Sequence, residues 1–345
     1  MSSKSGADSS RRTRRGVTSV DVAAAAGVSQ ATVGRVFSSP EKVSPATRDK
    51  VQDAAARLGY VPNVIARSLK SQRTNIIGAV VPAFGEYWQS VLTEFSRQLA
   101  TKDRQLLLFS FAEPGDVDGV LASVAQYRLD GLVLASATIG QDQLIQMRES
   151  DRPVVAFNHP AATGIVPSVS VDNEAGMARL AMHLIDTGAR EILYVGGVSS
   201  ASTDQTRYRG ASRTLGEHGV ACTYLEAGAF TYEAGYKVAQ HIVERQSVPD
   251  AVMVSSDEVA FGVHDGLRAA GVQVPADLLL TGFDGLSQSA WAGFDLTTLV
   301  QATDVLVARA IEILLADDRP PESDPVSVVV SGTIRYGKTT AKRHD

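Results

Sequence analysis

A short segment near the start of the chain carries side chains of the kinds that read DNA bases. Arg35 can donate two hydrogen bonds at once, the geometry that pairs arginine with guanine, and Gln30 can donate one and accept one, which pairs glutamine with adenine. Ala31 offers a methyl group for a thymine methyl. Ser29 and Thr32 carry hydroxyls suited to phosphate oxygens. Each bidentate contact contributes roughly 1–3 kcal/mol of discrimination between the right and the wrong base pair, so these residues predict sequence-specific DNA recognition.

A second set of side chains lies further along the chain, each close after a predicted strand. It mixes an arginine, two acids, an amide and aromatic rings: Tyr87, Trp88, Asn158, Arg207, Phe230, Asp257 and Asp284. Such a mixture fits a polar, hydroxylated small molecule, because charged groups bind hydroxyls in pairs while an aromatic ring covers the apolar face. His159, Ser199 and Ser200 occupy similar positions, although a lone loop histidine is more often solvated than functional.

Several of these residues also have a purely structural explanation. Arg207 would suit a surface ion pair, and Asp284 would suit the cap of a following helix. Tyr87 and Trp88 would suit ordinary core packing, since aromatic residues after a strand are often buried. These alternatives stay open at the level of the sequence.

Capping signals predict the helices that must position the DNA-reading segment. Thr18 to Asp21 form a capping box, and Gly27 ends the first helix by taking the left-handed conformation. Ser29 caps a second helix over residues 30–37, and a third begins at Ser44 with Pro45 in its first turn and ends near residue 59. Two helices joined by a tight glycine-containing turn form a helix-turn-helix, although a small helical bundle without DNA-binding activity would share the same signals.

From residue 75 onward, short apolar runs alternate with amphipathic stretches. Two series of buried strands are expected, at residues 76–81, 105–111, 131–136 and 153–158, and at 191–197, 222–228, 251–256 and 278–284. Helices are expected between them, as at 88–100 and 141–148. The alternation predicts doubly wound parallel sheets, and two series predict two similar lobes. Ligands of such sheets bind beyond the carboxyl ends of the strands, which is where the second set of side chains lies.

Charge is distributed unevenly along the chain. Residues 1–75 hold 13 Lys and Arg against 5 Asp and Glu, a net charge of +8, while the remainder carries 20 and 33, a net charge of −13. A basic head suits phosphate contacts, and an acidic body repels DNA. A solvated basic tail explains the arginines of residues 11–15, but not Arg35, Arg48 and Lys50 inside predicted helices.

The chain resembles LacI/GalR-family transcriptional regulators in several ordered motifs. These are VTSVDVAAAAGVSQATVGRV, VSPATRDKV, LGYVPN and ARSL in the head, and Arg207-x-x-Gly210, Ser256-Asp257, Gly282-Phe283-Asp284 and Phe230 in the body. The resemblance implies an all-α helix-turn-helix headpiece followed by an α/β two-lobed periplasmic-binding-protein-like domain. It also implies that Arg207, Phe230, Asp257 and Asp284 contact a small effector, and that Gln30, Ala31 and Arg35 set operator preference. One departure is Gly34, where the family usually has serine.

The segment after the third helix is too short to form a stable helix alone. The resemblance implies that it folds on the operator as a pair in a homodimer, with Leu69 wedged into the minor groove. An ordinary linker role for Leu69 is the alternative. The residues expected to contact DNA are Thr18, Ser29, Gln30, Ala31, Thr32, Arg35, Asn63, Arg67 and Leu69.

Other classes of protein fit the sequence less well. A sugar-binding transport receptor would share the body, but not the DNA-binding head, and no apolar signal segment follows the arginine pairs of residues 11–15. An enzyme would need a catalytic motif such as a nucleophile elbow or an HExxH motif, and the sequence contains neither. Cys222 is the single cysteine, which excludes an internal disulfide and a CxxC metal site. We therefore expect no catalysis, metal or cofactor, and a cytoplasmic location.

The expected organisation has five parts. They are a disordered basic tail (1–16), a helix-turn-helix domain (17–60), a hinge (61–74), a first lobe (75–174 with 303–326) and a second lobe (175–302 with 327–340). The expected function is that of a transcriptional regulator, most simply a repressor. It would bind a pseudo-palindromic operator as a homodimer and respond to a sugar-like effector.

Overall fold

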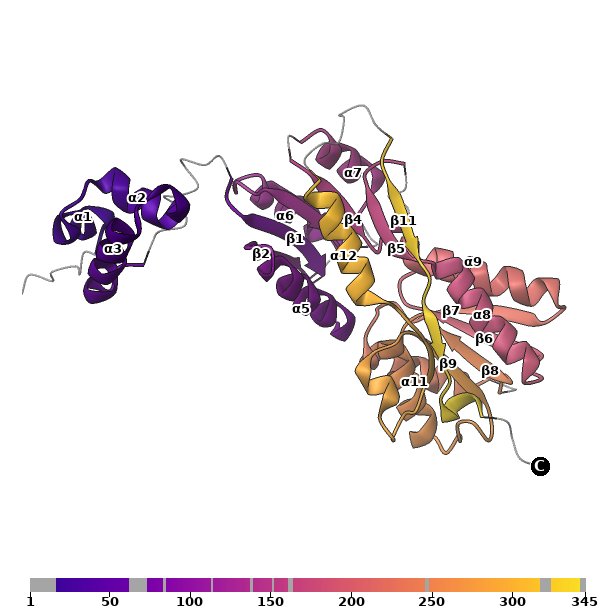
Figure 1. Cartoon of the computed structure of the whole chain (residues 1–345). Coiled ribbons are helices and arrows are strands. Elements are labelled where there is room, and N and C mark those ends of the chain that lie inside the picture. Colours follow the sequence, from indigo (N-terminus) through magenta and orange to yellow (C-terminus); the bar gives the residue numbers. More distant parts are fainter. Residues whose placement is uncertain are drawn as a thin grey trace, which may run out of the picture. The chain divides into compact units, whose positions relative to one another are not determined.

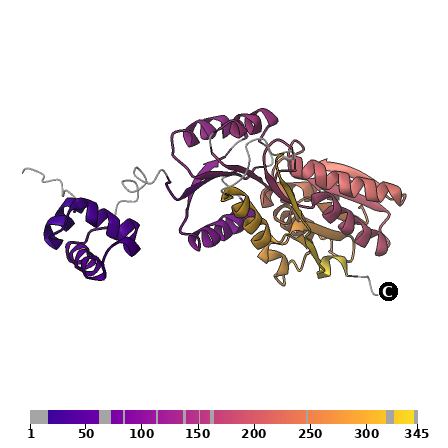
Figure 2. The same cartoon turned by 45° about the horizontal axis from the view of Figure 1, so that its top comes forward.

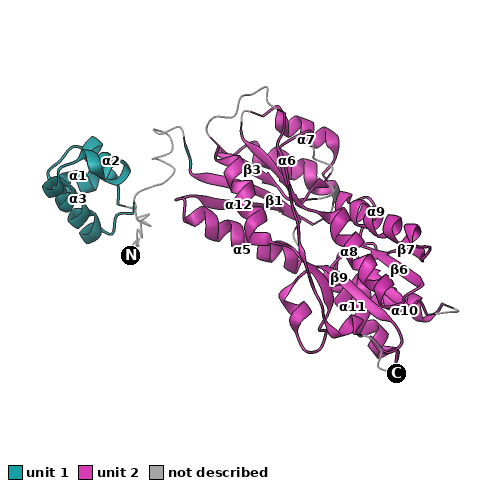
Figure 3. Cartoon of the chain, turned by 45° about the vertical axis from the view of Figure 1, so that its right-hand side comes forward, with its two compact units in different colours: residues 1–74 teal, residues 75–345 magenta. Residues whose placement is uncertain are grey.

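The chain forms two compact units in a computed structural model, residues 1–74 and 75–345 (Figure 3). The structure describes residues 17–61, 73–82, 85–112, 114–136, 139–150, 152–160, 164–245, 248–316 and 324–341. The predicted tail and most of the predicted hinge, with Asn63, Arg67 and Leu69, lie outside the described residues.

Helices make up the described part of the first unit. They are α1 (Ser19–Ala26), α2 (Gln30–Ser38) and α3 (Pro45–Leu58), with a 3₁₀ turn η1 (Pro40–Lys42) between the last two (Figure 1). The predicted capping box is confirmed, since the Asp21 N–H donates to Thr18 Oγ1 at 3.4 Å and the Thr18 N–H donates to Asp21 Oδ2 at 2.8 Å. Gly27 and Gly59 end α1 and α3 with φ of 66°, a conformation that costs glycine little.

Serine caps behave in two ways in this unit. Ser29 Oγ accepts the N–H of Thr32 at 3.1 Å, as predicted for the start of α2. Ser44 stands at the predicted cap position of α3, but its hydroxyl donates to Thr47 Oγ1 at 2.9 Å rather than accepting a backbone N–H. The three helices pack on a shared apolar core that includes Val22, Val33 and Val51. This packing, more than the caps, holds helices of 8, 9 and 14 residues in place.

The second unit contains two six-stranded sheets. The first has the order β11-β5-β4-β3-β1-β2, with all its pairings parallel. Its strands are β1 (Ile76–Pro82), β2 (Gln105–Phe111), β3 (Gly131–Leu134), β4 (Val154–Phe157), β5 (Ser168–Val171) and β11 (Ser327–Val330). The second has the order β12-β10-β9-β8-β6-β7, and only β12 runs antiparallel to its neighbour. Its strands are β6 (Glu191–Gly196), β7 (Ala221–Glu226), β8 (Ala251–Val254), β9 (Leu279–Asp284), β10 (Thr297–Val300) and β12 (Thr333–Arg335).

Helices cover both faces of each sheet, which confirms the predicted doubly wound architecture (Figure 2). The first lobe carries α5 (Glu86–Ala100) and α12 (Thr303–Leu314) on one face, and α6 (Val117–Val124) and α7 (Gln141–Arg148) on the other. The second carries α8 (Asn173–Asp186) and α9 (Ser202–Glu217) on one face, and α10 (Tyr232–Val243) and α11 (Asp257–Ala269) on the other. Short 3₁₀ turns complete the body: η2 (Pro114–Asp116), η4 (Ser287–Ala290) and η5 (Lys338–Thr340).

The chain crosses between the lobes three times, after β5, after β10 and after β11 (Figure 1). The first two crossings fall close to the expected residues 174 and 302. The third differs from the expected position near 326, because β11 pairs with β5 and so belongs to the first sheet. The chain passes to the second lobe only between Val330 and Thr333. Among the described residues, no helix is long and apolar enough to span a membrane.

Candidate functional site

The second helix of the head presents one face to solvent. Gln30, Ala31, Gly34 and Arg35 are exposed, whereas Val33 and Val36 are buried in the core of the unit. Positions four residues apart lie on one side of a helix, so Gln30 with Gly34 and Ala31 with Arg35 line one exposed surface. Gln30 Nε2 donates to Ser19 Oγ of α1 at 3.0 Å, which links the two helices of the motif. Thr18, Ser29 and Thr32 gather at the start of the helices, where backbone N–H groups favour phosphate.

Gly34 lies on this exposed face in helical backbone, and a Cβ added to it would meet nothing within 4 Å. Gly34→Ala is therefore expected to stabilise α2 by about 0.5–1 kcal/mol, because alanine loses less backbone entropy on forming a helix. Amide hydrogen exchange of α2 in the full-length protein measures the change. Gly27→Ala is the matched control and should destabilise α1, since Gly27 has φ of 66°. Equal exchange rates in the two variants would contradict this account.

In the body, Arg207 is buried where α9 faces the ends of β8 and β9. Its Nε donates to Asn173 Oδ1 at 2.8 Å, and one terminal nitrogen donates to the carbonyl oxygen of Ser255. The other terminal nitrogen lies 3.3 Å from Asp284 Oδ1. The guanidinium also stacks on the ring of Phe283 at 3.8 Å from its centroid. The alternative of a surface ion pair for Arg207 is therefore wrong.

A chain of hydrogen bonds runs from this ion pair to the first lobe. Gln301 Nε2 donates to Asp284 Oδ1 at 2.8 Å, and the Tyr87 hydroxyl donates to Gln301 Oε1 at 3.0 Å. Asn158 Nδ2 donates to the Tyr87 hydroxyl oxygen at 3.2 Å. The chain thus joins α5 and the end of β4 to the end of β9 through the crossing after β10. Asp284 takes part in this chain rather than capping a following helix.

Burial changes the acid–base properties of these groups. Removal from water raises the pKa of Asp284 to about 6, although the charge of Arg207 opposes the shift. Burial also raises the pKa of Tyr87 far above its usual value, and the charge of Asp284 adds to this effect. Asp284 has φ of 126°, a strained conformation for a residue other than glycine. Strain of this kind is retained where neighbouring contacts hold it, often at functional sites.

Asp257 is fully buried at the first turn of α11. Its carboxylate accepts the hydroxyl of Thr298 at 2.5 Å and the N–H of Leu286 at 2.8 Å. Burial raises its pKa to about 7, and the nearby charge of Asp284 acts in the same direction. A Cβ added to Gly282 would lie 2.3 Å from Asp257 Oδ1, so only glycine fits beside this carboxylate.

This shift predicts how stability depends on pH. The pKa of Asp257 in the folded protein, about 7, lies above its ordinary 3.8, so the folded state holds the proton more tightly. The contribution of this proton to the free energy of unfolding is fully present below about pH 4 and is lost as the pH rises toward 7. Asp257→Asn should flatten this dependence by at most about 1.4 kcal/mol per pH unit, as measured by urea unfolding between pH 4 and 7. The exposed Asp142→Asn should keep the wild-type slope, and an unchanged slope in Asp257→Asn would overturn the assignment.

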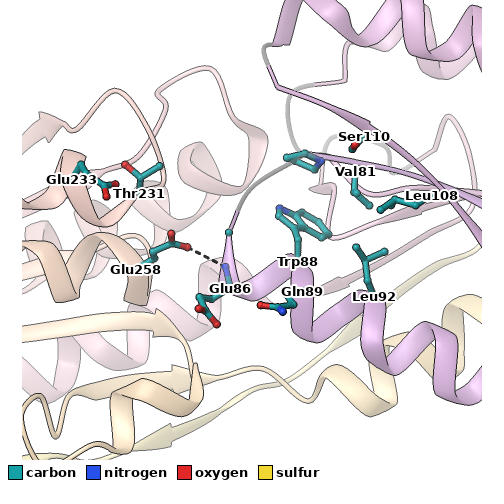
Figure 4. A pocket seen from close by; sticks show the side chains of 12 residues that line it. Val81, Glu86, Trp88, Gln89, Leu92, Leu108, Ser110, Thr231, Glu233 and Glu258 are labelled. Carbon is teal, nitrogen blue, oxygen red and sulfur yellow. Dashed lines mark hydrogen bonds between the residues drawn. The ribbon is translucent and has the colours of Figure 1, made fainter.

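An open cleft of about 570 Å³ lies beside the network, between the lobes (Figure 4). Its walls come from the end of β1, the start of α5, and β2 on one side, and from the starts of α10 and α11 on the other. The lining residues are Val81, Pro82, Gly85, Glu86, Trp88, Gln89, Leu92, Leu108, Ser110, Thr231, Glu233 and Glu258. The Glu86 N–H donates to Glu258 Oε2 across the lobes at 3.3 Å.

The structure separates the predicted effector residues into two groups. Tyr87, Asn158, Arg207 and Asp284 meet in the hydrogen-bonded network, and Asp257 lies beside it. Trp88 lines the open cleft, and the ring of Phe230 lies against Gly197, where an added Cβ would fall 2.2 Å from the ring. His159 is buried and bonds the Ile139 carbonyl oxygen at 2.8 Å, so it is not the solvated loop residue that was expected.

Sequence reasoning missed residues that complete the site. Gln301 and Asn173 connect the buried groups, and Glu86, Glu233 and Glu258 line the cleft. Glu258 directly follows Asp257, and its place beside a predicted effector residue was a signal that could have found it. Gln301 gave none, because its role depends on a crossing between lobes. Among the described residues, no group of three or more His, Cys, Asp or Glu side chains is arranged to hold a metal ion.

Comparison with known proteins identifies the family. Residues 74–313 match the family described as periplasmic binding proteins and sugar binding domain of LacI family, and residues 18–63 match bacterial regulatory proteins, lacI family. The chain belongs to the LacI family. It is a DNA-binding transcriptional regulator with the head and body typical of LacI-family proteins.

Relatives within the LacI family cover nearly the whole chain. Catabolite control protein A of Priestia megaterium is 31% identical over 303 residues, covering 86% of this chain and 91% of the relative. The protein of the same name from Staphylococcus epidermidis is 28% identical and covers 94% and 99%. These relatives are named as regulatory proteins rather than enzymes.

Solved structures of LacI-family proteins share the fold. The Lac repressor dimer bound to operator and the anti-inducer ONPF has a TM-score of 0.84 at 22% identity, covering 94% of this chain and 99% of that one. The complex of the transcriptional regulator CelR with cellobiose has a TM-score of 0.68 at 25% identity, with the same coverage. The LacI fold therefore extends over both units of the chain.

Proposed function

We infer that the protein is a cytoplasmic, non-catalytic repressor that binds a pseudo-palindromic operator as a homodimer. A small polar effector, a sugar or a related metabolite, controls its affinity for that operator. The observation that carries this proposal is the division of the chain into a head with an exposed DNA-reading face and a two-lobed body whose lobes meet at a buried polar network. The Lac repressor and CelR complexes, which contain operator and sugar ligands, give it further support.

In this proposal, Gln30, Ala31 and Arg35 contact base edges, while Thr18, Ser29 and Thr32 contact phosphates. Asn63, Arg67 and Leu69 belong to the hinge, which folds on the operator, with Leu69 wedged into the minor groove. Two-fold symmetry of the dimer requires two-fold symmetry of the DNA site. The two heads are thereby set at a fixed spacing.

Effector control follows from the connection between the lobes. An effector bound at Tyr87, Trp88, Asn158, Arg207, Phe230, Asp257 and Asp284 would replace some hydrogen bonds of the network. Because the Tyr87–Gln301–Asp284 chain spans both lobes, such a change alters how one lobe sits on the other. The two hinges then change their spacing and the operator affinity changes, a coupling typically worth about 1–3 kcal/mol.

Selection of duplexes from a random pool by the purified protein tests this function. We expect an enriched palindrome. Arg35→Ala should weaken binding about tenfold to a hundredfold and relax the preference at one base pair of each half-site. Arg57→Ala, an exposed charge on α3, is the matched control and should leave base preference unchanged. An asymmetric site would overturn the dimer, and no enrichment with or without added sugars would overturn the DNA-binding role of the head.

A further inference from the structure

The open cleft between the lobes is lined by acidic side chains. Glu86 comes from α5 of the first lobe, and Glu233 and Glu258 come from α10 and α11 of the second. Figure 4 shows Glu258 joined to the backbone of Glu86, with Trp88 in the same first turn of α5. No lysine, arginine or histidine is among the described residues that line this cleft.

The nearest buried cation does not offset these charges. Arg207 is paired with Asp284, stacked on Phe283 and hydrogen-bonded to Asn173 and the Ser255 carbonyl oxygen. The charge of its guanidinium is therefore neutralised by Asp284, and its nitrogens already donate hydrogen bonds within the protein. Asp257, buried beside this pair, adds a further acid. The region where the lobes meet thus has an excess of carboxylates, and an anionic ligand would enter against them.

Two further features indicate what a ligand in this region would supply. Asn158 Oδ1, at the end of β4, is buried in a side chain that is 4% exposed and has no hydrogen-bond partner. A buried acceptor of this kind calls for a donor, because leaving it unpaired is unfavourable. Trp88 offers an aromatic surface to the cleft, and Leu92 and Leu108 continue the apolar wall. Cations bind favourably over indole rings.

We propose that the effector is a small molecule with a protonated amine as well as hydroxyl groups, an amino sugar being the simplest example. Its ammonium group would lie near Glu86, Glu233 and Glu258, and its apolar face against Trp88. The inference rests on the proposed effector role of the space between the lobes, and it specifies the charge of the ligand. Carboxylates can also bind the hydroxyls of a neutral sugar, but three of them with no basic side chain in the lining favour a ligand that carries a positive charge, and they would repel a sugar phosphate.

The state of Glu258 without ligand supports this proposal. Burial raises its pKa, and the charges of Glu86, Asp284 and Glu233 raise it further, while the N–H of Glu86 opposes the shift. The carboxylates therefore repel one another across the cleft. An ammonium ion placed between them would relieve that repulsion, which a neutral hydroxyl would do only weakly.

The charge of the cleft can be measured without knowing the effector. The chain has two tryptophans, and Trp291 is 58% exposed, so Trp291→Phe leaves Trp88 as the sole reporter. At low ionic strength, caesium should quench Trp88 fluorescence more than iodide does, relative to free N-acetyltryptophanamide. We expect the ratio of caesium quenching to iodide quenching to fall about twofold or more in the triple variant Glu86→Gln, Glu233→Gln, Glu258→Gln. Glu149→Gln, an exposed acid on the first lobe, should leave it unchanged. Stronger quenching by iodide, unaffected by the three substitutions, would overturn the proposal.

Matched ligands then test binding. Glucosamine, N-acetylglucosamine, glucose and glucose 6-phosphate form one set, and the galactose series forms a second. In at least one set, the amine should raise the midpoint of thermal unfolding more than the other ligands do. Glu233→Gln should weaken binding of the amine about threefold to fivefold, and Glu149→Gln should not weaken it. If no amine raises the midpoint above its N-acetylated counterpart, the proposal is wrong. Failure of the operator selection would instead overturn the proposed function itself, because that experiment tests DNA binding by the head and not ligand binding by the cleft.

Discussion

Arg207→Met is expected to lower the free energy of unfolding of the body by about 3 kcal/mol or more. The substitution keeps most of the side-chain volume but leaves Asp284 buried without its cation. Removing one partner of a buried ion pair typically costs about 3–5 kcal/mol, because the remaining charge must be protonated or exposed to water. Urea unfolding of the full-length protein near pH 7.5 measures the loss. The loss should shrink as the pH falls and Asp284 takes up a proton.

A matched control for this prediction lies on the same helix. Arg213 of α9 pairs with Glu174 at 2.8 Å, but its side chain is 58% exposed. Arg213→Met should cost less than about 1 kcal/mol, as expected for a surface pair. In a double-mutant cycle, adding Asp284→Asn to Arg207→Met should recover part of the lost stability, because no unpaired charge remains. Equal losses for the two arginine variants would show that Arg207 and Asp284 do not form a buried pair.

Gly262→Ala is expected to destabilise the second lobe by about 3 kcal/mol. A Cβ at this position would lie 1.9 Å from the Tyr232 carbonyl oxygen and 2.7 Å from the backbone nitrogen of Tyr236, so α11 would have to move away from α10. Overpacking against backbone atoms commonly costs about 1–3 kcal/mol, and here no flexible side chain can give way. Gly235 makes the reciprocal approach, since its added Cβ would lie 2.0 Å from the Val259 carbonyl oxygen. Thermal unfolding measures the effect.

Gly216→Ala serves as the control for this substitution. Gly216 lies near the end of α9, where an added Cβ meets nothing within 4 Å. We expect a gain of roughly 0.5 kcal/mol, from the lower entropy of the unfolded chain. Because α10 and α11 supply Glu233 and Glu258, separating them should also weaken the binding of any amine in the cleft. A stable Gly262→Ala variant would mean that the two helices do not approach as closely as described.

The head was predictable because its signals are local. The capping box of Thr18 and Asp21 and the glycine stops at Gly27 and Gly59 lie within a few residues of the turns that they set. The central strands of both sheets were likewise visible as continuous apolar runs. The missed strands, β5, β10, β11 and β12, are 3 or 4 residues long, and each contains serine, threonine or arginine. The strands β3, β4 and β8 are equally short but consist only of glycine and apolar residues, so only they stood out as continuous apolar runs.

The site was partly predictable for a related reason. The rule that ligands lie beyond strand ends correctly placed Asp284 and Arg207 in one region, where they meet at 3.3 Å. It could not indicate that these two side chains would pair with each other. Nor could it find Gln301, which lies on a crossing between lobes and connects Tyr87 to Asp284. Such connections depend on the closure of one lobe on the other, which no local pattern encodes.

The three crossings between the lobes mean that neither lobe is a continuous piece of chain. A fragment ending before α12 lacks a helix and a strand of the first lobe, and also the strand β12 of the second. Late truncation therefore damages both lobes, and neither can be produced alone by cutting the gene at one point. The two lobes should consequently unfold in a single cooperative transition in calorimetry. Any rotation of one lobe against the other must bend all three crossing segments at once.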